Sequence, residues 1–184
     1  MKWPANLPTD SIDALAYYGS WPHWPVPASS ETDLLRRMDR LGMRQAVVLS
    51  LRSVFGHAGA GNQELAALVR RRPGRLVGAA TYDPRRPDPP GQVMGRAREA
   101  GLRGLALFPA HHGYTPGDEP LVEEALWIAE DYSWPVIMSI RLVMCWWLPA
   151  ASARAIVDLA ERHRRVNIIV AGGYGMGCKE GFNM

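Results

Sequence analysis

The sequence predicts an α/β fold in which parallel strands alternate with helices, and three observations support this prediction. Six short apolar segments begin about 30 residues apart, which is the spacing typical of βα units. These segments are almost continuously apolar, as expected for strands buried on both faces of a parallel sheet. Amphipathic patterns with a helical period fill the intervals between them. The predicted strands are residues 12–18, 45–51, 76–82, 102–108, 135–140 and 166–171.

Five helices are predicted between these strands from the signals at their ends. Residues 30–33 form a capping-box pattern, and Gly42 is placed to end the first helix. Asn62 is expected to cap the second helix. Pro120 and Pro149 suit the first turns of the fourth and fifth helices, because a first turn leaves its N–H groups unpaired in any case.

The number of strands and the length of the chain define the architecture further. Alternating βα units build either an open doubly wound sheet or a (β/α)8 barrel. No Gly-x-Gly-x-x-Gly follows the first strand, which disfavours a dinucleotide-binding sheet. A closed barrel typically takes about 250 residues, whereas this chain has 184. The sequence therefore predicts an incomplete or distorted (β/α)8 barrel of about six parallel strands and five intervening helices. It forms one domain, residues 1–184, with a glycine-rich tail at 172–184.

The composition disfavours several classes of protein. The net charge of +3 comes almost entirely from arginine, because Lys2 and Lys179 are the only lysines. The arginines lie mostly on predicted helix faces opposite acidic residues, which favours solvated faces over a nucleic-acid surface. No apolar run reaches the about 18–20 residues of a membrane span. Cys145 and Cys178 lack metal-binding spacing and no secretory signal is present, so we expect a cytoplasmic protein with reduced thiols.

A series of short motifs covers most of the chain, from residue 12 to residue 173. Each motif is weak alone, but their order and spacing are more specific. The motifs are L-x-x-M-D-x-L-G-M-x-x-A-V-V at 35–48, G-N-x-E-L at 61–65, P-G-R-L-V-G at 73–78, G-x-x-G-x-x-L-x-P at 101–109 and H-G-Y at 112–114. Together they resemble the amidohydrolase 2 family of metal-dependent hydrolases and decarboxylases, which are related to aminocarboxymuconate-semialdehyde decarboxylase.

The resemblance implies a barrel with metal ligands at the ends of its strands, yet the first ligand positions are changed here. The family's first strand carries Asp-x-His-x-His, and this chain keeps Asp13 but has Leu15 and Tyr17 in place of the two histidines. The fourth strand of the family reads Gly-x-Lys-Leu-His-Pro, where this chain has Ala106 for the lysine and Phe108 for the histidine. Leucine and phenylalanine have no lone pair to donate to a metal ion.

The later ligand positions differ in the same way. Residues 139–141 replace the histidine that ends the fifth strand of the family, and Gly172 replaces the one after the sixth. The aspartate of the eighth strand has no counterpart in this chain. We therefore predict no metal cofactor. A relocated Zn²⁺ or Mn²⁺ site is the alternative, and its ligands would be His111 and His112 with His23, His57 or Asp83.

Aromatic residues gather in the predicted loops after the first, fourth and fifth strands. In a barrel these loops lie at one face, where function collects. The rings either fill the space that a metal and its water would take, form a protein or peptide interface, or bind a small aromatic ligand. The candidate ligand- or partner-binding residues are Tyr17, Trp21, His23, Trp24, Phe108, Tyr114, Trp146 and Trp147.

Polar candidates for catalysis are few. His111, His112 and Arg141 are the residues that a metal-independent reaction would use, because imidazole titrates near neutral pH. His57 is predicted to be an exposed residue of the long second loop. His163 falls at the end of the fifth helix, where the helix dipole favours a cation, and it needs no function there.

Three functions follow from these observations. The leading hypothesis is a metal-free amidohydrolase-like protein that acts as a non-catalytic partner or regulatory subunit of an active relative. It would form a homo-oligomer or a complex with a metal-bearing homologue. The first alternative is a metal-independent or weakly metal-dependent hydrolase or decarboxylase acting on a small carboxylate or aromatic substrate. The second is a protein that binds a small ligand.

Overall fold

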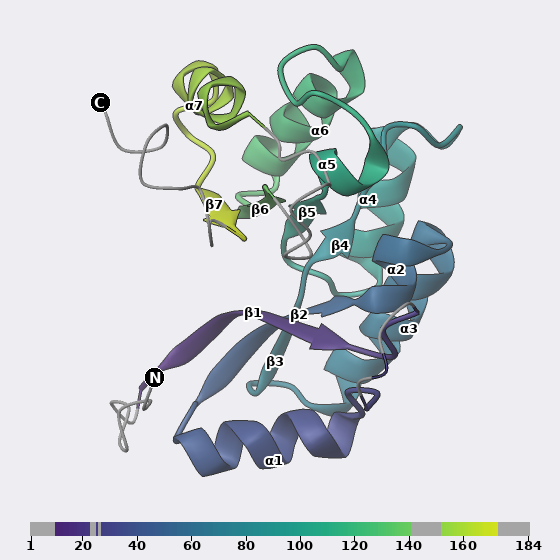
Figure 1. Ribbon diagram of the computed structural model, residues 1–184, viewed down its shortest axis with the longest axis vertical. Coiled ribbons are helices and arrows are strands. Elements are labelled where there is room, and N and C mark those ends of the chain that lie inside the picture. Colours follow the sequence, from purple (N-terminus) through teal and green to yellow (C-terminus); the bar gives the residue numbers. More distant parts are fainter. Residues whose placement is uncertain (1–9, 23–24, 26, 141–151, 173–184) are drawn as a thin grey trace. The chain divides into compact units, whose positions relative to one another are not determined.

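The described residues form two compact units along the chain (Figure 1). The computed structural model describes residues 10–22, 25, 27–140 and 152–172. The first unit takes the chain up to Thr81 together with Arg96–Arg103, and the second takes Tyr82–Gly95 and the chain from Gly104 onward. The chain therefore passes from the second unit to the first within helix α4 (Pro90–Glu99).

The first unit holds a parallel sheet of three strands. Strands β1 (Ile12–Tyr18), β2 (Gln45–Ser50) and β3 (Leu76–Gly78) pair in that order. A shift in register between Asp13 and Ala16 gives β1 a bulge. The predicted third strand is interrupted after β3, and a second short strand, β4, continues at Ala80–Thr81.

Helix α1 (Glu31–Leu41) lies alongside this sheet, and both of its ends follow the sequence prediction (Figure 1). Ser30 Oγ accepts a hydrogen bond from the backbone N–H of Asp33, and the Asp33 carboxylate accepts one from the backbone N–H of Ser30. This reciprocal pair is the predicted capping box. Gly42 ends the helix in the left-handed region, at φ 68°, where glycine meets no steric penalty.

The predicted second loop, residues 53–61, instead contains most of a short helix, α2 (Leu51–Phe55), and the first turn of α3 (Ala58–Arg71). The cap of α3 is His57, whose Nδ1 accepts a hydrogen bond from the backbone N–H of Ala60. The predicted cap Asn62 is wrong, because Asn62 lies inside α3 and is buried. His57 is exposed, as expected, but its ring has a structural role at the start of the helix.

The second unit repeats the same plan with strands β5 (Leu105–Leu107), β6 (Val136–Ser139) and β7 (Ile168–Ala171). They pair in parallel in that order. On the other side of β5, the backbone N–H of Tyr82 donates to Ala106 O at 3.2 Å, so β5 is an inner strand. Helices α5 (Pro109–His112), α6 (Pro120–Asp131) and α7 (Ala153–Arg162) complete this unit.

The starts of the last two long helices test two sequence predictions. Pro120 occupies the first turn of α6, as predicted. Helix α7 begins at Ala153 and is capped by Ser152, whose Oγ accepts from the backbone N–H of Ala155. Pro149 was expected to open this helix, but it lies outside the described residues. The five predicted helices correspond to α1, α3, α4, α6 and α7, and the short α2 and α5 are additional.

Burial on both faces distinguishes the inner strands from the outer ones. Every residue of β5 and β6 is buried, and β2 is nearly so. The prediction of two-sided burial is wrong for β1 and β7, whose exposed apolar side chains include Ile12 (50% exposed), Ile169 and Val170 (48%). No helix among the described residues has the length and apolar character needed to cross a membrane.

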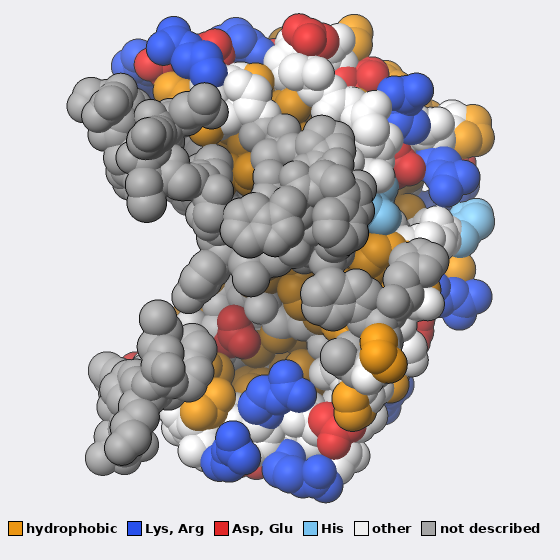
Figure 2. All heavy atoms as spheres, viewed as in Figure 1, with side chains coloured by type: hydrophobic (Ala, Val, Ile, Leu, Met, Phe, Trp, Pro, Cys, Tyr) orange, Lys and Arg blue, Asp and Glu red, His pale blue; other side chains and the backbone are white. Residues whose placement is uncertain are grey.

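The arginines lie on helix surfaces beside carboxylates. Figure 2 shows basic and acidic side chains intermixed over α1 and α7. Arg71 and Arg72 both pair with Glu31, and Arg75 pairs with Asp39. Such pairing is typical of solvated helix faces and leaves little unbalanced positive charge on these surfaces.

One ion-pair cluster joins α6 to α7 and corrects the interpretation of His163. The His163 ring is buried, and its Nε2 lies 2.5 Å from Glu123 Oε2. Arg162 Nε donates to Glu123 Oε1 at 3.0 Å. His163 therefore ends α7 as part of a buried polar contact, which the helix dipole alone does not explain. Burial by itself raises the pKa of Glu123, but the hydrogen bonds from His163 and Arg162 outweigh it and the pKa is lowered.

We expect Gly61→Ala to destabilise the protein by about 1–3 kcal/mol, because overpacking strains a well-packed site. A Cβ at Gly61 would come within 2.2 Å of Ser53 N and 2.6 Å of Ser53 Cβ, where α2 and α3 meet. The matched control is Gly95→Ala in α4, whose Cβ meets nothing within 4 Å. That change should stabilise the helix by about 0.5–1 kcal/mol. Urea unfolding measures both, and a stabilised Gly61→Ala protein would contradict the close approach of the two helices.

We expect Glu123→Gln to lower stability near neutral pH by about 1–3 kcal/mol, because the buried His163 loses its carboxylate partner. The folded state lowers the pKa of Glu123 from its ordinary value of 4.5. The contribution of Glu123 is therefore complete above that value and is lost as pH falls through the lower, folded pKa.

The difference in stability between the two proteins should accordingly shrink between neutral pH and about pH 3. Urea midpoints across this range measure it. The control is Asp158→Asn, which removes an exposed pair with Arg154 and should change stability little. If the stability difference between the wild-type and Glu123→Gln proteins stays constant with pH, folding does not lower the pKa of Glu123.

Candidate functional site

The end of β1 carries packed aromatic rings in the first unit. Trp21 meets Tyr17 edge to face, with ring centroids 5.4 Å apart, and meets Phe55 in the same way at 5.7 Å. Burial raises the pKa of Tyr17 to about 12, so its phenol stays neutral. Phe55 belongs to α2, and no sequence motif had drawn attention to it. Tyr17, Trp21 and Phe55 thus form one packed group of rings.

The aspartate that the family motif retains is engaged with its own strand. Asp13 Oδ1 accepts a hydrogen bond from the backbone N–H of Leu15 at 3.0 Å, next to the bulge in β1. A carboxylate held in this way supports the local backbone. Leu15 and Tyr17, which stand where the family has histidines, provide an apolar side chain and a neutral phenol.

The ends of β5, β6 and β7 in the second unit are equally poor in metal donors. Ala106 and Phe108 are buried, with Phe108 only 1% exposed, and the Phe108 ring meets His112 at 5.8 Å. Ser139 ends β6 and is buried. Gly172 directly follows β7 and has no side chain to offer. The remaining candidates, His23, Trp24, Arg141, Trp146 and Trp147, lie outside the described residues, and so does Cys145.

The two neighbouring histidines lie in helix α5, where the sequence analysis placed a loop. Gly113 ends this short helix at φ 71°. His111 is exposed, whereas the His112 side chain is almost buried. His112 Nδ1 lies 3.8 Å from Asp83 Oδ1, and the two imidazole rings are 5.3 Å apart. The structure therefore brings His112 close to Asp83, one of the residues suggested for a relocated metal site.

Asp83 is the centre of a group of titratable residues that we call the Asp83 cluster: Tyr82, Asp83, His112 and Tyr114. Asp83 Oδ1 accepts from the backbone N–H of Arg85 at 3.0 Å. Asp83 Oδ2 accepts from Arg86 Nε at 3.3 Å. The carboxylate is thereby held in place at the start of the loop that follows β4.

The two tyrosines of the Asp83 cluster are kept neutral. Burial, with a smaller effect of the Asp83 charge, raises the pKa of Tyr114 well above 10. Burial and the charge of Glu124 raise the pKa of Tyr82 to about 12. Tyr82 is 1% exposed, and its hydroxyl has no hydrogen-bond partner in the described part of the chain. Both phenols therefore remain protonated at physiological pH.

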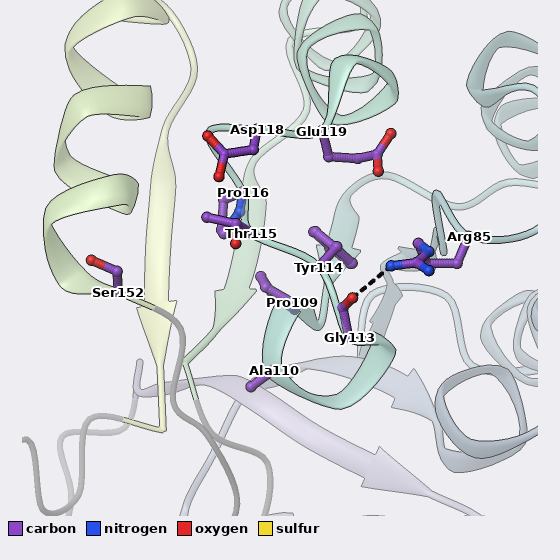
Figure 3. A pocket seen from close by; sticks show the side chains of 10 residues that line it. All are labelled: Arg85, Pro109, Ala110, Gly113, Tyr114, Thr115, Pro116, Asp118, Glu119 and Ser152. Atoms are coloured by element: carbon purple, nitrogen blue, oxygen red, sulfur yellow. Dashed lines mark hydrogen bonds between the residues drawn. The ribbon is translucent and has the colours of Figure 1, made fainter.

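An open hollow of about 500 Å³ lies beside α5, within the range of ligand pockets. Arg85 Nη1 donates to Gly113 O at 2.7 Å and fixes the guanidinium at its edge (Figure 3). The hollow thus combines charged, hydroxyl and apolar groups. Its lining consists of Arg85, Pro109, Ala110, Gly113, Tyr114, Thr115, Pro116, Asp118, Glu119 and Ser152.

A buried polar network in the first unit was missed by the sequence analysis. Ser53 Oγ donates to Ser50 O and lies 2.7 Å from Thr81 Oγ1. Asn62 Nδ2 donates to Thr81 O, and Asn62 Oδ1 accepts from Thr81 N–H, both at 2.9 Å. Asn62 thus pairs with the backbone of Thr81 as a neighbouring strand would. An asparagine on the inner face of an apolar helix is the signal that could have indicated it.

The residues present do not fit a divalent metal at the family positions. Two of those positions hold Leu15 and Phe108, which cannot ligate, and Tyr17 is a neutral phenol. Within residues 10–22, 27–140 and 152–172, no three His, Cys, Asp or Glu side chains come together to hold an ion. Asp83 and His112 supply two groups of a relocated site, and the described residues provide no third.

Comparison with known proteins identifies the class to which this chain belongs. The model of a family described as "Amidohydrolase" matches residues 25–176. The chain therefore belongs to the amidohydrolase family, the family that its motifs resemble. The comparison with curated proteins gives no match.

Solved structures of the same fold come from several bacteria. The chain is similar to the manganese-bound 5-carboxyvanillate decarboxylase of Novosphingobium aromaticivorans, with a TM-score of 0.70 and 14% identity over 92% of this chain and 68% of that one. It is similar to a 2,6-dihydroxybenzoate decarboxylase from Rhizobium, at a TM-score of 0.65 and 17% identity, over 88% and 65% of the two chains.

A third similar structure is a probable 2-pyrone-4,6-dicarboxylic acid hydrolase from Acinetobacter baumannii. Its TM-score is 0.58 and its identity 15%, and the match covers 88% of this chain but only 57% of that one. At these identities the likeness establishes the fold. The chain has the parallel α/β architecture of the amidohydrolase barrels and spans about 57–68% of their length, so the predicted incomplete barrel is confirmed.

We expect Tyr82→Phe to leave stability unchanged or to raise it by up to about 1 kcal/mol, because the change removes a buried hydroxyl that has no partner. Tyr82→Ala should cost about 3–5 kcal/mol, since it removes the packed ring. Thermal or urea unfolding measures both. A clear loss of stability in Tyr82→Phe would show that the hydroxyl makes a hydrogen bond.

Proposed function

We propose that this chain is a metal-free amidohydrolase-family protein that acts as a non-catalytic partner or regulatory subunit of an active relative. The observation that carries the proposal is the chemistry of the strand ends. Leu15, Tyr17 and Phe108 occupy positions where the family resemblance implies metal-binding histidines. The Tyr17 ring packs against Trp21, and Phe108 is buried. A chain that has the family fold without the metal-binding histidines favours a role in binding over a role in metal catalysis.

The outer strands supply the second support for a partner. Among the described residues, β1 pairs only with β2, and β7 pairs only with β6. Each outer strand also exposes apolar side chains, Ile12 on β1 and Ile169 and Val170 on β7. An uncovered parallel edge with apolar side chains favours pairing with further chain. A second copy of this chain or a metal-bearing homologue would cover these edges in the proposed complex.

The Asp83 cluster favours a second candidate function, a metal-independent hydrolase or decarboxylase acting on a small carboxylate or aromatic substrate. An imidazole beside a buried carboxylate can move a proton, and His112 and Asp83 have this arrangement at 3.8 Å. The similar structures include decarboxylases of aromatic acids. In this candidate function His112 would be the acid or base, and His111 and Arg141 would contact the substrate.

We expect the purified chain to hold no stoichiometric metal, because its family positions lack donors. Elemental analysis after purification without chelators measures this. One tightly bound Zn²⁺ or Mn²⁺ for each chain would overturn the metal-free proposal. Release of CO₂ from 2,6-dihydroxybenzoate that survives EDTA and disappears in His112→Gln would favour the second candidate function.

We expect the chain to form a complex with itself or with a coexpressed family member that retains the metal histidines. Size-exclusion chromatography with light scattering would then report a mass above the 20.4 kDa of one chain. Val170→Lys and Ile12→Lys should weaken the complex by charging the outer strands. Trp127→Lys is the matched control, because Trp127 is a 60% exposed apolar residue on α6. A mass of 20.4 kDa both for the chain alone and for the chain coexpressed with the family member would overturn the partner proposal.

A further inference from the structure

The hollow beside α5 contains an arginine whose charge is not matched by any carboxylate of the described residues. Arg85 and Arg86 are neighbours, yet only Arg86 pairs with Asp83. Arg85 donates to the carbonyl oxygen of Gly113, and no ion pair involves it in the described part of the chain. A carbonyl fixes the position of the guanidinium without neutralising it. The guanidinium keeps further N–H donors for an anion.

Two carboxylates line the same hollow, and no cation of the described residues pairs with either of them. Asp118 and Glu119 make no ion pair within residues 27–140 and 152–172. Glu119 is the cap residue of α6, but its side chain makes no capping hydrogen bond. Figure 3 shows Arg85 and Glu119 on one side of the view, with Asp118 and Ser152 on the other. Charges of opposite sign thus face one hollow without pairing with each other.

The rest of the lining suits a short ligand with polar ends. Pro109, Ala110 and Pro116 give an apolar surface whose shape is held by two proline rings. The hydroxyls of Thr115 and Ser152 lie among these groups. A ligand lying across the hollow would place aliphatic atoms on the prolines and its ends near the charged residues.

We propose that this hollow binds a small zwitterion, whose carboxylate is taken by Arg85 and whose amine is taken by Asp118 on the other side of the hollow. Charge complementarity selects this class. A dicarboxylate would bring one anionic end to Asp118, and a diamine would bring one cationic end to Arg85, so each would meet like charge. The inference concerns the second unit alone and does not depend on the proposed partner role.

Three ligands with chains of five carbon atoms test the proposal: 5-aminopentanoate, glutarate and 1,5-diaminopentane. Isothermal titration calorimetry with the full chain should detect 5-aminopentanoate and give at least about tenfold weaker binding for the other two. Equal or tighter binding of glutarate or of the diamine would overturn the assignment to a zwitterion. The absence of heat with all three, at millimolar ligand, would overturn the site itself.

Charge variants distinguish the two ends of the site. Arg85→Gln, which keeps a donor for Gly113 O, should weaken the binding of 5-aminopentanoate about tenfold. Asp118→Asn should weaken it by a similar factor. Arg85→Glu should shift the preference to 1,5-diaminopentane. The matched controls are Arg86→Gln and Glu161→Gln, which change the same charges at exposed positions outside the hollow. Controls that weaken binding as much as Arg85→Gln does would show a general charge effect and overturn the site.

Discussion

Burial of the inner strands on both faces is the constraint on which the rest of the structure depends. β5 and β6 expose no residue, so each strand needs cover on two sides, and the helices that supply it return the chain to the same end. Parallel pairing then brings the residues after each strand to one end of each sheet. Phe108 and Ser139 occupy such positions, and Asp83 follows β4 in the same way. The positions after the strands are therefore set by the fold, and their chemistry is set separately by the sequence.

This separation allows one scaffold to carry different residues at the ends of its strands. At the end of β1, Tyr17 packs against Trp21, and Phe108 is buried directly after β5. Burial of such rings removes apolar surface from water and so stabilises the fold. The charged groups that remain near the strand ends, Asp83 and Arg85, lie in the loop after β4 and serve other contacts.

Sequence patterns predicted elements whose determinants are local. The capping box at Ser30 and the stop at Gly42 depend on residues within one turn, and both are present. Asn62 was misjudged because its partner, Thr81, is 19 residues away. His163 was misjudged because its partner, Glu123, belongs to another helix. Local signals thus identified the ends of helices, whereas contacts between distant segments required the structure.

In the candidate site, too, local sequence signals were predictable and contacts between distant segments were not. The motifs alone showed that Leu15 and Phe108 stand where the family resemblance implies metal-binding histidines. The hollow was not, because Arg85, Asp118 and Ser152 come from three separate loops and match no motif. Tyr114 was proposed from its aromatic character, and the structure adds its neutral, nearly buried phenol. Residue type indicated which side chains merited attention, and tertiary folding decided which of them share a surface.

The return of α4 to the first unit has a consequence for synthesis on the ribosome. The first unit contains Arg96–Arg103, so it is not a continuous stretch of chain. Leu102 is fully buried against Gly78, and the backbone N–H of Arg103 donates to Gly78 O at 2.8 Å. A nascent chain that has emerged only to Thr81 still lacks this part of its core. Completion of the first unit must therefore wait until part of the second has been made, which couples the two in time.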